Sequence, residues 1–195
     1  MELKLVNEND PILQQPTQDW DFANPPCDPV ELAHSMYDLM NQSAGIGLAA
    51  PQVGLPYRMF VMRSVPKLAI FNPKIVWTSD KEVEMEEGCL SFPGLGIRVF
   101  RPESIRTRFT SPNGVTETKL FNGLTARVFQ HEYDHLNGIC FTSKVSKLKL
   151  DMYERKRKKL ARKIEQGRVT LDRDWSSYFD TATPKEYDPQ STAGW

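Results

Sequence analysis

The sequence predicts an α+β fold in which antiparallel β-strands pack around a central helix, with one helix before the strands and a basic helix after them. The order of the patterns is helix, several short β-type runs, then helix, which is typical of domains with separate α and β elements. One pair of runs is joined by a hairpin signal, which favours antiparallel pairing. Of the 195 residues, 39% are hydrophobic, enough for a single core.

The first helix is predicted over residues 29–42. Asp28 suits the N-cap, Pro29 suits the first helical position, and Glu31 adds an acidic residue to the first turn. The preceding residues 1–28 are rich in Pro, Asn and Asp and predict an extended arm along the surface. Apolar residues recur through the helix at helical spacing, namely Ala33, Met36, Tyr37 and Met40.

Short β-type runs fill the region from about residue 58 to residue 120. Turn signals separate them: Asn72-Pro73, Pro93-Gly94 and Pro112-Asn113-Gly114. The last of these signals predicts a hairpin between residues 105–109 and 115–120. The other runs expected to form strands are Met59–Met62, Ala69–Phe71, Ile75–Trp77 and Ile97–Phe100.

A second helix is predicted from near Asn122 to Gly138, with asparagine as the N-cap and glycine at the C′ position. A third is predicted from Lys147 to Gln166, and Gly167 is a suitable stop. These boundaries place the second helix directly after the predicted hairpin.

The charge is unevenly distributed near the C-terminus. Residues 144–168 hold eleven Lys or Arg against three acidic residues, whereas residues 169–195 hold two basic and five acidic residues. We therefore divide the chain into a catalytic domain over 1–146, a basic helix over 147–168 and a loosely ordered acidic tail over 169–195.

The composition also bears on where the protein works. The formal net charge is zero, so overall charge favours no particular partner. The N-terminus lacks the pattern of a signal peptide, and no apolar run approaches membrane-spanning length. The three cysteines, an odd number, predict reduced thiols in a cytoplasm rather than a disulfide framework: Cys27, Cys89 and Cys140.

The run His131-Glu132-Tyr133-Asp134-His135 is an HExxH motif on the predicted second helix. Positions i and i+4 lie on one face of a helix, so both imidazoles can reach one metal ion. The glutamate beside the first histidine can then take a proton from a water molecule on that metal. The motif predicts a metal-dependent hydrolase.

Two histidines leave a catalytic metal one protein ligand short. Phe141 stands where the extended motif HExxHxxGxxH requires its third histidine, which excludes that class of peptidase. A later glutamate is a second possibility, and Glu154 and Glu165 are available, although both lie in the highly charged segment. Cys89, at a turn before a strand, is the better candidate.

Three stretches together resemble the peptide deformylase family. They are residues 45–54 (GIGLAAPQVG), 87–91 (EGCLS) and 130–136 (QHEYDHL), and they occur in the order that the family has. The resemblance extends over roughly residues 1–145. It implies that the protein removes the N-formyl group from N-formylmethionyl nascent peptides and releases formate. The alternative is a zinc metallopeptidase that cleaves internal peptide bonds.

The resemblance also implies a ligand set and the groups around it. The metal would be held by Cys89, His131 and His135, with Fe2+ as the physiological ion and Zn2+, Ni2+ or Co2+ able to occupy the site. Glu132 would be the general base. The side-chain amide of Gln52 and the backbone N–H of Leu90 would face the oxyanion that forms during hydrolysis.

Substrate contacts follow from the same comparison. The substrate would pair like a strand with Ile46-Gly47 on one side, where glycine lets an extended peptide approach closely, and with the strand at Cys89 on the other. An apolar pocket for methionine would contain Ile46, Met85, Leu124 and Val128. Gly96 stands about where many family members have an arginine, and Phe92 where many have Ile or Val, so the contacts farther along the substrate differ from the family pattern.

The last implication concerns partners. The basic helix over 147–168 suits phosphate-rich RNA and, by resemblance to bacterial deformylases, the ribosome; a solvated helix face explains the same charges equally well. We expect a monomer in a bacterial cytoplasm, or in a host cytoplasm if the chain is encoded by a phage.

Overall fold

The computed structural model describes residues 2–64 and 66–166 of the chain. Three α-helices are present in these ranges, α1 (Pro29–Gln42), α2 (Gly123–Leu136) and α3 (Lys147–Glu165). Short 3-10 helices, η1, η2 and η3, cover Pro11–Gln14, Ala50–Val53 and Phe141–Lys144. Together with the antiparallel strands, these elements confirm the predicted α+β class.

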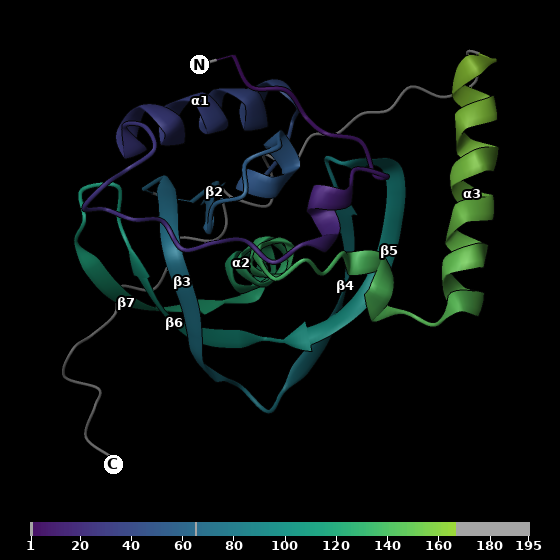
Figure 1. The fold of residues 1–195 in the computed structure, drawn as a ribbon. Coiled ribbons are helices and arrows are strands. Elements are labelled where there is room, and N and C mark those ends of the chain that lie inside the picture. The colour runs from purple at the N-terminus through teal and green to yellow at the C-terminus, as the bar shows by residue number, and fades with distance from the viewer. Residues whose placement is uncertain (1, 65, 167–195) are drawn as a thin grey trace.

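The strands form two antiparallel sheets around α2. The larger sheet has the order β1-β2-β3-β6-β7, and the smaller sheet is the β4–β5 pair. Figure 1 shows α2 nearly end-on in the middle, with α1 above it and α3 beside β5. The strands are β1 (Gly47–Ala49), β2 (Met59–Met62), β3 (Leu68–Thr78), β4 (Glu82–Cys89), β5 (Phe92–Pro102), β6 (Ser104–Thr110) and β7 (Thr116–Asn122).

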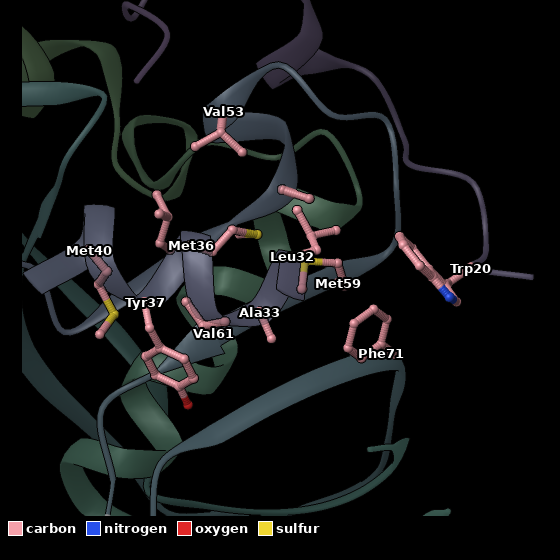
Figure 2. Close-up of a cluster of buried hydrophobic side chains, with 12 residues drawn as sticks. Trp20, Leu32, Ala33, Met36, Tyr37, Met40, Val53, Met59, Val61 and Phe71 are labelled. Carbon is pink, nitrogen blue, oxygen red and sulfur yellow. The ribbon is translucent and has the colours of Figure 1, made fainter. Parts of the chain in front are cut away.

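The helix α1 begins where the sequence predicts. The Asp28 carboxylate accepts hydrogen bonds from the backbone N–H groups of Val30 (2.8 Å) and Glu31 (2.9 Å), so it satisfies two donors that the first turn leaves free. One face of the helix is buried against β2 and neighbouring segments, as Figure 2 shows. This face includes Leu32, Ala33, Met36, Tyr37 and Met40.

The prediction of a turn at Asn72-Pro73 is wrong. Residues 68–78 form the single strand β3, and its pairing with β6 shifts register just after Phe71. Asn72 has a φ of 49°, and its side chain exchanges hydrogen bonds with the backbone of Trp20 at 2.7 and 2.9 Å. Asparagine tolerates a left-handed conformation and a bulge accommodates the following proline, so the strand bends without ending.

The strand β4 is not among the runs named above, although the substrate pairing expected from the family resemblance involves a strand at Cys89. A strand with one buried face normally alternates apolar and polar residues. In β4 this alternation is hard to recognise, because a glutamate, Glu87, lies on the buried face together with Cys89. The signal at Pro93-Gly94 was also misplaced, since both residues lie inside β5 and the chain turns at Leu90 and Ser91. Cys89 is thus the last residue of a strand, directly before a tight turn.

The β6–β7 hairpin and the second helix agree closely with expectation. Asn122 occupies the N-cap of α2, although its side chain makes no capping hydrogen bond. Gly138 ends this region with a φ of 69°, and a Cβ there would lie 2.8 Å from the backbone of Gln14. Only glycine fits both constraints.

The segments at the two ends of the described chain pack on this frame. The N-terminal arm is more than a surface segment, because Leu13 and Trp20 are fully or almost fully buried. The helix α3 packs against β5. Gly167 and the tail over 169–195 lie outside the described residues, and the division of the chain at residue 146 stays a prediction. Along the described ranges, every helix is too short or too polar to cross a lipid bilayer.

Candidate metal centre

Three buried side chains from two elements converge at one point. His131 and His135 lie one helical turn apart on α2, and Cys89 ends β4. Their ligand atoms all lie within 4.8 Å of one another, and the Cys89 Sγ lies 3.3 Å from His135 Nε2. The spacing of the histidines follows from helical geometry, whereas the position of Cys89 depends on the β4–β5 turn.

Glu87 sets the orientation of His131. His131 Nδ1 donates to the Glu87 carboxylate over 2.9 Å, which leaves the other ring nitrogen available as a ligand. Burial on its own would raise the pKa of Glu87, but hydrogen bonds from Arg101 and His131 lower that pKa well below its usual range. Glu87 therefore stays a carboxylate.

A buried ion-pair network supports this carboxylate. Arg101 binds Glu87 in a bidentate manner at 2.6 and 2.9 Å and reaches Asp134 at 2.6 Å. Arg127 adds a contact to Glu87 at 2.8 Å, and Lys144 pairs with Asp134 at 3.0 Å. Since Glu87 and the two arginine side chains are only 3–5% exposed, each charge needs its partners.

The sequence pattern marks only part of this network. Glu87 belongs to the same short motif as Cys89, and in the structure it contacts both Arg127 and His131. Arg101 was missed. The available signal was its position in β5, where Ile97, Val99 and Arg101 alternate with exposed residues and therefore share the buried face.

Glu132 lies beside the three ligand candidates with a free oxygen. Its Oε2 is buried and has no hydrogen-bond partner, and burial raises the pKa of the carboxyl group to about 7. Gly47 in β1 lies directly against this side chain, because a Cβ on Gly47 would come within 2.8 Å of the Glu132 carboxylate carbon. Glycine at 47 thus makes room for the carboxylate.

The Gln52 side chain is fixed in one orientation. Its Oε1 accepts a hydrogen bond of 2.8 Å from the backbone N–H of Ala49, which turns the amide nitrogen toward Cys89 Sγ at 3.2 Å. The same nitrogen lies 3.5 Å from Ser91 Oγ. A buried amide donor therefore faces the cluster of Cys89 and the two histidines.

A cavity of about 280 Å³ opens over these groups. Its lining includes Cys89, His131, Glu132, Gln52 and Leu90. Four of the five residues predicted to contact substrate also line it, namely Ile46, Gly47, Leu124 and Val128. The fifth, Met85, lies outside the lining, although it shares the inward face of β4 with Glu87 and Cys89.

The donor set fits a divalent metal ion. A thiolate and two imidazoles suit iron or zinc, and three protein ligands leave a coordination position open. Burial keeps the pKa of His135 well below its usual value, so this side chain is in the neutral form that binds metals. Glu132, whose Oε2 has no hydrogen-bond partner, lines the same cavity as Cys89 and His131.

Comparisons with known proteins agree with this geometry. The family model described as polypeptide deformylase matches residues 2–151. The chain belongs to the polypeptide deformylase family. A peptide deformylase of Christiangramia forsetii is 36% identical, with 88% of this chain and 94% of that protein covered. Another, from Brucella suis, is 45% identical, with 67% and 78% covered.

Solved deformylases share the fold. A Synechococcus elongatus peptide deformylase, crystallised with actinonin, matches with a TM-score of 0.74 and 34% identity over 80% of this chain and 88% of that one. The Thermotoga maritima deformylase matches with a TM-score of 0.71 and 32% identity over 75% and 99%. Deformylases are metal-dependent hydrolases that remove N-formyl groups from nascent peptides, so the metallopeptidase alternative is not favoured.

Proposed function

We propose that this deformylase hydrolyses N-formylmethionyl peptides with Fe2+ held by Cys89, His131 and His135, and that Zn2+, Ni2+ or Co2+ can take its place. The observation that carries the proposal is the convergence of one sulfur and two ring nitrogens within 4.8 Å beside the free Glu132 oxygen. When bound, a divalent ion supplies Lewis acidity toward a carbonyl and acidifies water.

Glu132 is proposed as the general base and later the general acid. It takes a proton from the attacking water and returns it to the departing amine, so that the products are formate and a peptide with a free N-terminus. Its position supports this role, because Glu132 lines the cavity and its Oε2 has no hydrogen-bond partner. Burying a carboxylate oxygen without a partner costs stability, and such perturbed groups are concentrated at functional sites.

Gln52 and Leu90 are proposed as the two donors to the oxyanion. The Ala49 N–H holds the Gln52 amide in a single orientation, so its nitrogen needs no rearrangement to face the reacting oxygen. Leu90 follows Cys89 at the turn and lines the same cavity, which is the position from which a backbone N–H can contribute the second donor.

The substrate is proposed to lie as an extended strand between Ile46-Gly47 and the end of β4. The apolar side chains of Ile46, Leu124 and Val128 line the cavity and provide a wall for methionine. Met85 lies outside that lining, so its predicted contact with the substrate gains no support.

The finer statements on partners are proposals as well. We infer that the basic helix α3 approaches ribosomal RNA, because its exposed face carries many lysine and arginine side chains. We also infer a monomer that works in the cytoplasm of a bacterium, or of an infected host if the chain comes from a phage.

The test is to purify the full chain without oxygen, measure its metal content, and assay formate release from formyl-Met-Ala-Ser. We expect iron at about one ion per chain and turnover of the formylated peptide, with no cleavage of an unformylated peptide. Cys89→Ser should lose iron and activity, whereas Cys27→Ser should keep both. A protein that binds no metal, or that retains iron and full activity after Cys89→Ser, would disprove the proposal.

A further inference from the structure

The C-terminal helix α3 contributes one residue to the lining of the cavity. Leu160 of α3 lines the same cavity as Cys89 and Glu132, although it lies more than one turn from the start and from the end of its helix. Figure 1 shows α3 standing beside β5, on the side of the molecule opposite β7. The helix therefore does more than present charge to the solvent.

Specific contacts hold α3 in this position. Arg157 donates to the backbone oxygen of Pro93 at 2.9 Å and pairs with Glu8 of the N-terminal arm at 2.7 Å. One turn earlier, the Tyr153 hydroxyl accepts from the backbone N–H of Arg98 at 3.3 Å. Five half-buried side chains recur three or four positions apart along one face of the helix, and Glu154 beside them is half-buried as well. The five are Leu150, Tyr153, Arg157, Leu160 and Ile164.

Two glycines of β5 also line the cavity. Gly94 has a φ of 77°, and a Cβ added there would lie 3.9 Å from the Arg157 side chain. A Cβ on Gly96 would meet the Glu86 side chain, so neither glycine adds a side chain of its own to the lining. Phe92 and Leu95 of the same strand line the cavity as Leu160 does, and α3 packs against this strand.

We propose that Leu160 determines specificity for a substrate side chain downstream of the formylated residue, and that it favours an apolar one. The inference rests on the proposed deformylase function. An extended peptide advances about 3.3 Å per residue, so the residues that follow the formylated one run along the cavity that Leu160 lines. Arg157 is a positioning residue here, because it holds α3 against β5.

The test compares formyl-Met-Ala-Ala with formyl-Met-Leu-Ala and formyl-Met-Ala-Leu. The wild-type protein should prefer a leucine-containing peptide, and Leu160→Ala should reduce that preference in kcat/KM by about four- to fifteenfold, which corresponds to one or two buried methylene groups. Leu160→Met, which keeps an apolar side chain of similar size, should retain the wild-type preference. Leu148→Ala is the matched control, because Leu148 is 74% exposed on the same helix and lies outside the cavity lining.

The outcomes separate this inference from the proposed function. If the wild-type protein releases no formate from any of the peptides, the proposed function fails. If it is active but Leu160→Ala keeps the wild-type preference, or lowers kcat/KM for all three peptides equally, Leu160 has no role in specificity. Arg157→Ala should also reduce the preference for the leucine-containing peptide. If the preference is unchanged in that variant, the position of α3 does not affect substrate selection.

Discussion

The Glu132 side chain occupies the space beside the proposed metal ligands that a side chain at position 47 would need. Replacing Gly47 by alanine would bring a methyl group within 2.8 Å of the Glu132 carboxylate carbon, so the carboxylate has to move. A displacement of about 1 Å at a reacting group costs roughly 100-fold in rate. We expect Gly47→Ala to lower kcat by about that factor while its metal content stays at the wild-type value.

Measurements of kcat for a formylated tripeptide and of bound metal by elemental analysis decide this prediction. A Gly47→Ala protein with wild-type kcat would show that the carboxylate tolerates displacement. If the Gly47→Ala protein instead loses its metal, the substitution acts by disturbing the metal ligands and not by displacing the Glu132 carboxylate.

The free oxygen of Glu132 leads to a second prediction at the same scale. Glutamine keeps the shape of the side chain but cannot accept and return a proton, so Glu132→Gln should lower kcat by about 100- to 10,000-fold. Metal content and thermal unfolding should change little, since the Oε2 atom makes no hydrogen bond in the protein. A variant that retains more than a tenth of the wild-type kcat would exclude Glu132 as the proton carrier.

The sequence predicts the place of a functional residue where its chemical type and its spacing along one helix both point to the same site. The HExxH motif fixes two histidines and a glutamate on one helical turn, so their proximity follows from the helix itself. Arg101 shows the opposite case. Its alternation with Ile97 and Val99 indicates the face of β5 on which it lies, but the partners that make its burial possible, Glu87 and Asp134, lie on other elements.

The β4–β5 hairpin is the element that joins the metal ligands to the rest of the site. It carries Cys89 and Glu87 on one strand and Arg101 on the other, and Arg101 bridges Glu87 to Asp134 of α2. Removing the guanidinium would leave two carboxylates with fewer partners in a buried environment. Such a change in a buried ion pair typically costs about 3–5 kcal/mol.

We therefore expect Arg101→Met to lower the free energy of unfolding by about 3–5 kcal/mol and to weaken metal binding, because Glu87 orients His131. Arg98→Met is the matched control. Arg98 lies on the same strand, but its side chain is 60% exposed and it pairs with Glu84 at 3.5 Å, so a loss of about 1 kcal/mol or less is expected. Urea unfolding of both variants provides the comparison, and equal losses would contradict the role of the network.

At the scale of elements, the sequence indicated helices better than strands. The N-cap, the helical spacing and the terminal glycine mark α1 and α2 locally. The strands depend on pairing with distant segments, so β3 continues through Asn72-Pro73 because β6 pairs with it on both sides of the bulge. The strand β4 carries glutamates on both faces because its buried glutamate has arginine partners elsewhere in the fold.

For the molecule as a whole, the proposed metal ligands join α2 to the end of β4. Cys89 and His135 are 46 residues apart in sequence, and a metal that binds only the folded state stabilises their arrangement. A ligand at 100 times its dissociation constant adds about 2.7 kcal/mol to the free energy of unfolding. For a chain of this size, that corresponds to roughly 5–10 °C in Tm.

Metal removal by a chelator should therefore lower Tm by about 5–10 °C, and restoring Fe2+ or Zn2+ should reverse the loss. In Cys89→Ser, the difference between the metal-treated and chelated protein should shrink, because serine replaces the thiolate that prefers these ions. Cys27→Ser should keep the full difference, since Cys27 lies outside the metal cluster. Calorimetry reports this effect without any assay of activity. If chelation left Tm unchanged although the metal had been removed, the metal would have no preference for the folded over the unfolded chain, which would contradict a site that exists only in the folded state.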